Sequence, residues 1–343
     1  MIQRTKFATC IGSIVATALW AGTVQADIAG SACTGGSPET SKIVVMADWL
    51  PWADQAPFFQ AINDGTYKKA GLEVEVRSPP NPADPLKLAA VKRVNFSFTY
   101  VPELMIAMET MVPVVSIAAL IHNASEGYVH SPDINSVADL KGKKIAYINN
   151  ATGKAILDTV LSTGGLKRED VNAIAAGYAG QKLFATGKVD AFHGTSWASM
   201  VVVNRQFKES GKPAAKIFKF NDHGVPGFPF IIIASNPDWL QAHPNTACAF
   251  MAATLKGLKT AMEDPEPINK WLEQARPGHM TLDDHRHRWE LMKPLWADKQ
   301  GRYFVQQADT WREAQAWALK TKVISAPVRD PNDYFTNAYL PKN

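Results

Sequence analysis

Short apolar segments rich in β-branched residues alternate with amphipathic helical segments along most of this chain. The first of them, Lys42–Ala47 (KIVVMA), is typical of a buried strand. A helix is predicted at Gln55–Lys69, followed by a half-buried strand at Leu72–Arg77 (LEVEVR). Strands separated by helices do not pair through tight hairpins, so they favour mostly parallel sheets with helices on their faces. The sequence therefore predicts an α/β fold.

The alternation falls into two blocks, followed by a helical C-terminal tail. The first block ends with a strand at Val114–Leu120, and the second runs from Lys144–Ile148 to Ala215–Phe220. The continuous apolar run Phe228–Ala234 predicts one more, fully buried strand. A chain of 343 residues has the length of about two ordinary domains. The tail carries tryptophans at amphipathic helical spacing, which we expect to pack in the core: Trp239, Trp271, Trp289, Trp296, Trp311 and Trp317.

The N-terminus has the pattern of an export signal. Two basic residues, Arg4 and Lys6, precede the apolar stretch Phe7–Ala21, and Val24-Gln25-Ala26 gives a small-x-small cleavage pattern. The apolar stretch is shorter than the ~20 residues of a membrane-spanning helix, which disfavours the alternative of an uncleaved anchor. We therefore predict a signal peptide at residues 1–26. Residues 27–41, rich in Gly, Ser and Pro, are predicted to form a flexible leader.

Charge and motif content exclude several classes of function. Without the predicted signal the chain has 34 basic and 32 acidic residues, so nucleic acid is not an expected partner. Neither a P-loop nor a G-x-G-x-x-G signature is present, so we expect no cofactor. His285 and His287 are two residues apart on a predicted helix and face different directions, so no metal site is expected.

Two cysteines, Cys33 and Cys248, remain after the predicted signal, which itself contains Cys10. In an oxidising compartment the two thiols can pair, but sequence alone does not test the geometry. The alternative is an unpaired Cys33 in a loose leader and a buried Cys248 on a helix. Lipidation of Cys33 is disfavoured because Gly30-Ser31-Ala32 lacks the leucine of a lipobox.

Several motifs, in order along nearly the whole predicted mature chain, match one family. They are Asp48-Trp49-Leu50-Pro51-Trp52, Gly65-x-Tyr67-Lys68-Lys69-Ala70-Gly71-Leu72, Tyr100-x-Pro102-Glu103, Asp139-Leu140-Lys141-Gly142-Lys143, Gly187-Lys188-Val189-Asp190-Ala191 and Tyr334-x-x-Asn337-x-x-Leu340-Pro341. With these motifs the chain resembles the thiamine-pyrimidine-precursor-binding (NMT1/THI5-like) family of periplasmic binding proteins. The Trp49 region and the C-terminal motif are the more specific of them.

The resemblance implies a type II periplasmic binding protein, in which two α/β lobes close around a ligand. We place lobe one at residues 42–122 plus 230–343, and lobe two, inserted into it, at residues 126–226. The segments 123–128 and 223–230 are the expected crossings and carry glycines that suit a hinge. The resemblance further implies a periplasmic protein that docks on an ABC permease; we expect it to be a monomer.

Ligands of open α/β sheets bind beyond the carboxyl ends of the strands, near helix N-termini. The candidate binding residues at these positions are Trp49, Asp54, Tyr100, Asn123, Asn149, Gly153, His193, Trp197 and Phe228. The set is aromatic and amide-rich with few fixed cations, which favours a planar, neutral ligand that stacks on Trp49 or Trp197. A sulfonate or nitrate would instead need arginine or several hydroxyls at helix starts.

Structural interpretations compete with several of these assignments. Asp54 is interpreted first as the N-cap of the following helix. Tyr100 shares an alternating face with Phe96 and Phe98, and Asn149 is an ordinary turn residue. Trp197 begins a helix and fits core packing equally well.

The expected function is non-catalytic capture of a pyrimidine thiamine precursor or similar heterocycle for an ABC importer. A flavin, an aromatic carboxylate or a sulfonate is the alternative ligand. A secreted serine hydrolase is the alternative of a different class, because His193-Gly194-Thr195-Ser196-Trp197-Ala198 resembles G-x-S-x-G with its last glycine replaced. Fungal members of the family make the pyrimidine with a histidine and a cysteine-rich motif. This chain has no cysteine cluster, so that activity is not expected.

Overall fold

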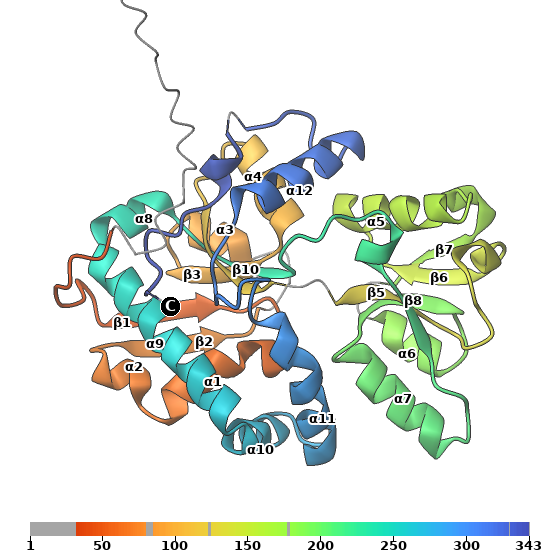
Figure 1. Cartoon of the computed structure of the whole chain (residues 1–343), viewed down its shortest axis with the longest axis horizontal. Helices are drawn as coiled ribbons and strands as arrows, with labels where there is room; N and C mark the ends of the chain where they lie inside the picture. The colour runs from red at the N-terminus through yellow and green to blue at the C-terminus, as the bar shows by residue number, and fades with distance from the viewer. Residues whose placement is uncertain (1–31, 80–84, 123–124, 177–178, 329, 343) are drawn as a thin grey trace, which may run out of the picture.

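The computed structural model describes residues 32–79, 85–122, 125–176, 179–328 and 330–342, which form two bodies side by side (Figure 1). Each body is built on a five-stranded sheet with helices on its faces. We call the body around the first sheet lobe one and the other lobe two. The predicted signal peptide, residues 1–26, lies outside the described residues. No helix within the described ranges is long and apolar enough to cross a membrane.

The sheet of lobe one has the order β2-β1-β3-β10-β4. Its strands are β1 (Lys42–Met46), β2 (Glu73–Arg77), β3 (Phe96–Thr99), β4 (Val115–Ile121) and β10 (Ile231–Ser235). β1 pairs in parallel with β2 and β3, whereas β10 is antiparallel to both β3 and β4. Four strands therefore point one way. β10 is entirely buried between β3 and β4, as its apolar run predicts.

The sheet of lobe two has the equivalent order β7-β6-β8-β5-β9. Its strands are β5 (Glu126–His130), β6 (Lys144–Tyr147), β7 (Asn172–Ala175), β8 (Ala191–Thr195) and β9 (Lys216–Lys219). Here β5 is antiparallel to β8 and β9. In both lobes the reversed strand is the first that the chain forms after crossing from the other lobe. The predicted α/β class with mostly parallel strand directions is confirmed.

The first crossing is shorter than predicted. Residues 126–128, assigned to the connection in the sequence, begin β5 and pair with β8 and β9 on both sides. Gly127 occurs within this strand because a Cβ there would lie 2.3 Å from the carbonyl oxygen of Phe218. β5 begins with a charged residue and a glycine, so its sequence lacks the apolar pattern of a strand. Its pairing with both neighbouring strands makes it extended.

The helix predicted at Gln55–Lys69 is two helices, α1 (Ala56–Asn63) and α2 (Thr66–Lys69). They are separated at Gly65, whose φ of 72° interrupts the helical path. α1 packs on α9 (Pro244–Glu263), and the two backbones approach so closely that a Cβ on Gly257 would lie 2.3 Å from the oxygen of Pro57.

The remaining helices flank the sheets and form the tail (Figure 1). They are α3 (Pro85–Ala90) and α4 (Val101–Glu109) in lobe one, α5 (Ala151–Thr163), α6 (Gly180–Ala185) and α7 (Ser199–Glu209) in lobe two, and α8 (Pro237–Ala242), α10 (Glu266–Ala275), α11 (Leu282–Met292) and α12 (Ala308–Lys320) in the tail. The tail returns to lobe one, as expected for core packing of its tryptophans. Five are buried, and the sixth, Trp271, stacks on Phe59 with ring centroids 4.1 Å apart.

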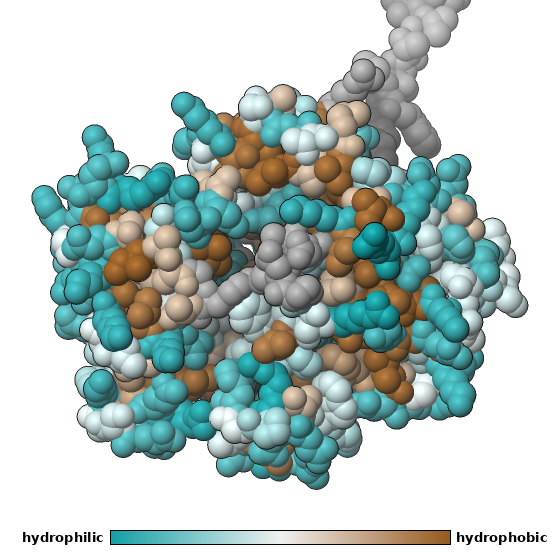
Figure 2. Space-filling model, turned by 180° about the vertical axis from the view of Figure 1, so that it is seen from behind, coloured by the Kyte–Doolittle hydropathy of each residue, from teal (hydrophilic) through white to brown (hydrophobic). Residues whose placement is uncertain are grey.

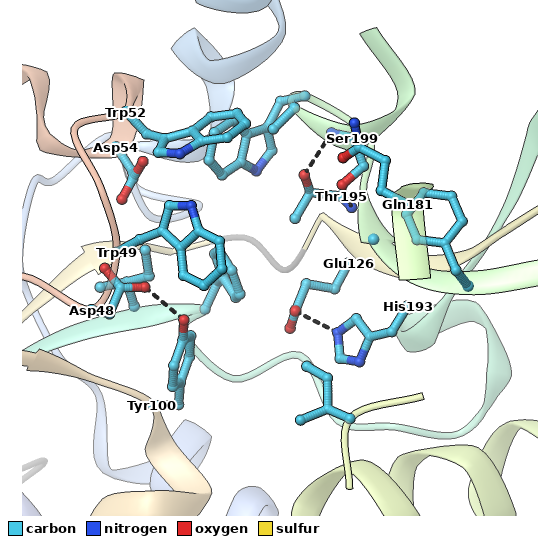
Figure 3. A pocket seen from close by; sticks show the side chains of 17 residues that line it. Asp48, Trp49, Trp52, Asp54, Tyr100, Glu126, Gln181, His193, Thr195 and Ser199 are labelled. Atoms are coloured by element: carbon cyan, nitrogen blue, oxygen red, sulfur yellow. Dashed lines mark hydrogen bonds and ion pairs between the residues drawn. The ribbon is translucent and has the colours of Figure 1, made fainter. Parts of the chain in front are cut away.

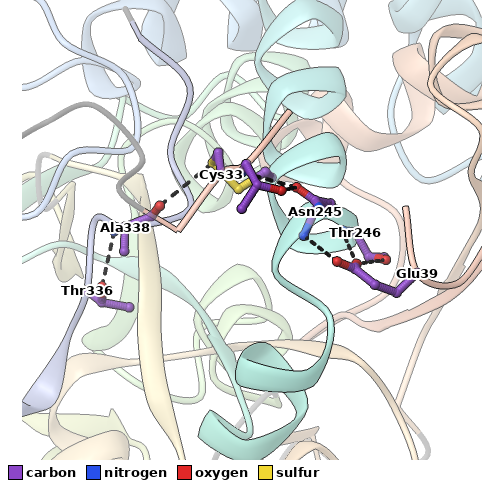
Figure 4. Close-up of a disulfide and its surroundings, with 8 residues drawn as sticks. Cys33, Glu39, Asn245, Thr246, Thr336 and Ala338 are labelled. Carbon is purple, nitrogen blue, oxygen red and sulfur yellow. Dashed lines mark hydrogen bonds between the residues drawn. A yellow bond between two sulfur atoms is a disulfide. The ribbon is translucent and has the colours of Figure 1, made fainter. Parts of the chain in front are cut away.

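The predicted flexible leader is not loose over its described part, residues 32–41. Cys33 forms a disulfide with Cys248 of α9, with 5.8 Å between the Cα atoms (Figure 4). Glu39 accepts hydrogen bonds from the backbone N–H groups of Asn245 and Thr246 at the start of the same helix. Burial raises the pKa of Glu39, but these hydrogen bonds together outweigh it and lower the pKa to about 2. The open question about the two cysteines is therefore settled in favour of pairing.

The disulfide joins residues 215 positions apart and so restricts a very long loop in the unfolded chain. We expect a double Cys33→Ser, Cys248→Ser variant to lose about 2–4 kcal/mol of unfolding free energy in urea titrations. Dithiothreitol should destabilise the wild type by a similar amount and leave the variant unchanged. Equal midpoints for reduced and oxidised wild type would contradict a stabilising role.

Candidate functional site

A cavity of about 190 Å³ lies where the two lobes meet (Figure 3). We call it the first cavity. Lobe one contributes residues after β1, at the end of β3 and at the start of β10. Lobe two contributes residues from β5, from the end of β6, from α6, from β8 and from the start of α7. Its walls are Asp48, Trp49, Trp52, Asp54, Tyr100, Glu126, Ile148, Gln181, Phe192, His193, Gly194, Thr195, Trp197, Ala198, Ser199, Phe230 and Ile231.

The loop after β1 supplies the aromatic side of the first cavity. Trp49 and Trp52 line it on this loop, before the chain enters the short 3₁₀ helix Ala53–Gln55. Asp48 is buried beside Trp49 and accepts a hydrogen bond from the Tyr100 hydroxyl at 2.6 Å. The carboxyl ends of β1 and β3 are adjacent in the sheet, so the pattern that placed Trp49 and Tyr100 at strand ends also places them together.

Two carboxyl groups of lobe one have perturbed acidity. Burial raises the pKa of Asp48, and the charge of Glu126 adds to the rise, while the hydrogen bond from Tyr100 opposes it. Burial also raises the pKa of Asp54, to about 7, with the charge of Asp48 adding to it and Arg288 opposing it. Near neutral pH, both forms of the Asp54 side chain are therefore populated: the protonated form, which can donate a hydrogen bond, and the ionised form, which only accepts.

Arg288 of α11 lies behind the aromatic wall rather than in the cavity lining. Its guanidinium carbon is 4.3 Å from the ring centre of Trp52 and 5.1 Å from that of Trp197, so it stacks on a tryptophan from each lobe. The two indole rings are edge-to-face, with 6.4 Å between their centres. Burial lowers the pKa of Arg288 to about 9, although the charge of Asp54 opposes the change. The two tryptophans thus separate this cation from the cavity.

Lobe two contributes a hydrogen-bonded acid–imidazole pair. Glu126 at the start of β5 and His193 on the neighbouring β8 are joined by a 2.6 Å contact between Oε1 and Nε2. In Figure 3 both side chains point toward Trp49 and Tyr100 across the cavity. His193 was predicted from the sequence. Glu126 was not, because it lies in the strand that was assigned to the crossing.

A second cavity of about 620 Å³ adjoins the first. The two share six wall residues: Asp48, Tyr100, Glu126, Ile148, His193 and Phe230. Beyond these residues the second cavity extends between α3 and α4 of lobe one and the start of α5 in lobe two. Seen from behind, the space-filling view shows a hollow between the lobes with hydrophobic surface next to it (Figure 2).

Most of the predicted binding residues meet at these cavities. Five line the first cavity: Trp49, Asp54, Tyr100, His193 and Trp197. Four line the second: Gly153, Phe228, and again Tyr100 and His193. Asn149 is exposed and lines neither, and Asn123 lies outside the described residues.

Two interpretations of single residues are wrong. Asp54 does not cap α1, because it lies inside the 3₁₀ helix and makes no side-chain capping bond. Nor are amides the main polar groups of the first cavity. Asn150 caps α5 by accepting a hydrogen bond from the Gly153 N–H at 2.7 Å. The wall of the first cavity has a single side-chain amide, Gln181, among its described residues, and its other polar groups are carboxyls, hydroxyls and the His193 ring. The strand ends were placed correctly, but which side chain turns inward depends on the tertiary fold.

The structure does not favour the alternative function of a serine hydrolase. Ser196 lines neither cavity, so it is not placed to act on a ligand held there. Within the described residues, no group of three or more His, Cys, Asp or Glu side chains could hold a metal ion.

Direct contacts between the lobes border the first cavity. Arg205 of α7 forms an ion pair with Asp284 of α11 at 3.2 Å between Nε and Oδ2. Val201 and Val202 of α7 are buried against Met280, just before α11. These contacts close the side of the site where Trp52 and Trp197 meet.

The model of the NMT1/THI5-like family matches residues 52–268, more than half of the chain. The protein belongs to this family. The resemblance seen in the sequence motifs is thereby confirmed.

Among curated relatives, the formylaminopyrimidine-binding protein of Halalkalibacterium halodurans is 26% identical over 293 residues, covering 83% of this chain and 87% of the relative. A putative thiamine biosynthesis protein of Haemophilus influenzae is 31% identical over 260 residues, covering 75% and 81%. The 4-amino-5-hydroxymethyl-2-methylpyrimidine phosphate synthase THI13 of Saccharomyces cerevisiae is 27% identical over 242 residues, covering 68% and 70%.

Among solved structures, the periplasmic aliphatic sulphonate binding protein SsuA from Escherichia coli matches with a TM-score of 0.67 at 13% identity, covering 87% of this chain and 92% of that one. At this identity the likeness shows the fold alone, and it confirms the type II periplasmic-binding-protein architecture.

Loss of the contact between α7 and α11 should favour the open form. We expect Arg205→Gln to weaken ligand binding about 3–10-fold, because a partly exposed ion pair contributes roughly 1 kcal/mol to closure. Small-angle X-ray scattering of the ligand-free variant should give a larger radius of gyration. Lys208→Gln, at an exposed position of the same helix, is the control. Unchanged scattering and affinity for Arg205→Gln would show that this ion pair does not hold the lobes together.

Proposed function

We propose that this protein is a periplasmic solute-binding protein that captures a small aminopyrimidine-like heterocycle between its lobes for an ABC importer. The observation that carries this proposal is the composition of the first cavity. Its walls combine the aromatic rings of Trp49, Trp52 and Tyr100 with the carboxyl groups of Asp48 and Glu126. A flat ring with N–H donors on its edge satisfies both kinds of wall.

The same composition disfavours an anionic ligand. Neither lysine nor arginine is among the described wall residues of the first cavity, and Arg288 is screened from it by Trp52 and Trp197. A sulfonate or nitrate would lie against several carboxyl groups, at a considerable electrostatic cost. The sulphonate-binding protein therefore shares the fold with this chain and, in our proposal, not the ligand class.

Transport explains the arrangement better than catalysis does. Fungal relatives are named as synthases, but both described cysteines of this chain are consumed in the disulfide. We propose that the ligand is released unchanged. The signal at residues 1–26 would direct export, residues 223–230 would act as a hinge, and the closed protein would dock as a monomer on a membrane permease.

Thermal shift of the purified mature protein tests the ligand class. We expect 4-amino-5-hydroxymethyl-2-methylpyrimidine or formylaminopyrimidine to raise the melting temperature, whereas ethanesulfonate, nitrate and benzoate should not. Riboflavin is included because a flavin is the planar alternative. A rise with the anions alone would overturn the stacking argument. Mass spectrometry of the recovered ligand should show an unaltered mass, and turnover would overturn the non-catalytic assignment.

Two substitutions test the wall residues. Trp49→Ala should weaken binding of the pyrimidine about 5–150-fold, because stacking of a base on an aromatic ring contributes about 1–3 kcal/mol. Glu126→Gln should weaken it at least about 10-fold, since the carboxylate is the stronger acceptor. Titration calorimetry gives both values.

Each variant has a matched control. Leu50→Ala changes an exposed residue of the same loop as Trp49, and Glu169→Gln removes an exposed carboxylate of lobe two. Wild-type affinity in Trp49→Ala or Glu126→Gln would remove that residue from the proposed site.

A further inference from the structure

The two cavities are neighbours that share part of their walls. Six residues belong to both walls, and among them Tyr100 and Phe230 from lobe one face Glu126 and His193 from lobe two at the junction. A ligand whose ring occupies the first cavity therefore lies next to the second, with these shared residues at the boundary.

The two cavities differ in the size of the chemical group that each can hold. About 190 Å³ suits a single six-membered ring with small substituents, whereas about 620 Å³ lies in the usual range for drug-sized ligands. A bare pyrimidine would leave the second cavity without an organic occupant. The closed lobes would then enclose apolar wall surface that makes no van der Waals contact with the ligand and contributes no binding free energy.

The walls of the second cavity are mainly apolar. Outside the junction they include Leu86 of α3, Phe98 of β3, Ile106 and Ala107 of α4, and Phe228 before β10. Aliphatic and aromatic walls favour an apolar group, because burial removes its surface and theirs from water.

The charged groups of the second cavity do not form a binding site for an ion. Lys87 lies on an exposed position of α3, so its ammonium group remains hydrated. Glu103 accepts a hydrogen bond from the Asn150 side chain of the opposite lobe at 3.3 Å. Burial raises the pKa of Glu103, which disfavours its charged form. The walls thus select an uncharged group.

We propose that the ligand of this protein is a pyrimidine that carries an uncharged apolar substituent of about the size of a second ring, and that this substituent occupies the second cavity. The inference rests on the proposed function, since the first cavity must hold the pyrimidine. It goes further in assigning the second cavity to the same ligand and in naming the chemistry of its extension.

A pair of synthetic ligands tests the inference by calorimetry on the full mature protein. The bare ligand is 4-amino-2,5-dimethylpyrimidine, and the extended ligand is 4-amino-5-benzyl-2-methylpyrimidine. We expect the extended ligand to bind 10- to 100-fold more tightly. Equal affinities would overturn the inference and leave the proposed function standing, whereas absence of binding by both would overturn both proposals.

A variant of the second cavity tests whether the tighter binding of the benzyl ligand arises there. Ala107→Trp fills part of the space from α4 and should abolish the advantage of the benzyl group while leaving affinity for the bare ligand within 2-fold. Ala107→Ser, which adds only one oxygen atom, is the matched control and should keep the advantage. A benzyl advantage that survives in a folded Ala107→Trp protein would place the substituent elsewhere and overturn the assignment.

A charged analogue tests the nature of the extension. The 4-carboxybenzyl ligand should bind no more tightly than the bare ligand, because its carboxylate would be desolvated among apolar walls. Tighter binding than the benzyl ligand would overturn the requirement for an uncharged group and indicate a contact with Lys87.

Discussion

The arrangement of the site depends on the burial of two aspartates at the end of β1, in a loop packed with tryptophans. Asp48 and Asp54 are desolvated, and their raised pKa values show that the fold favours their protonated forms. Arg288, whose charge opposes the rise at Asp54, stacks on Trp52 and Trp197 and does not line the cavity. The cleft therefore presents carboxyl groups and aromatic faces, while this positive charge is covered by the two tryptophans.

This arrangement couples recognition to the meeting of the lobes. Arg288 contacts a tryptophan from each lobe, and the ion pair between Arg205 and Asp284 lies on the same side of the cleft. Glu126 of lobe two adds its charge to the field at Asp48 of lobe one. Bringing the lobes together places Glu126 near Asp48, so a donor-bearing ligand between them can hydrogen-bond to carboxyl groups of both lobes.

Much of this was accessible from the sequence, and the failures have physical causes. Trp49, Tyr100 and His193 follow from strand ends, because parallel strands bring their carboxyl ends to one edge. Glu126 was missed because Glu126–His130 contains a glycine and becomes a strand only through its partners on both sides. Arg288 was missed because it lies on a tail helix whose docking behind Trp52 is a long-range contact that no local pattern encodes. The inward turn of Asp54 likewise depends on tertiary packing rather than on capping.

The bond between Cys33 and Cys248 also has a consequence for maturation. Cys33 emerges early during export and Cys248 only after β10 has been delivered, since β10 ends at Ser235. Lobe one is assembled from those two distant stretches, and the bond connects one stretch covalently to the other. It can form only after the chain that contains β10 has been made, so it belongs to a late stage of maturation.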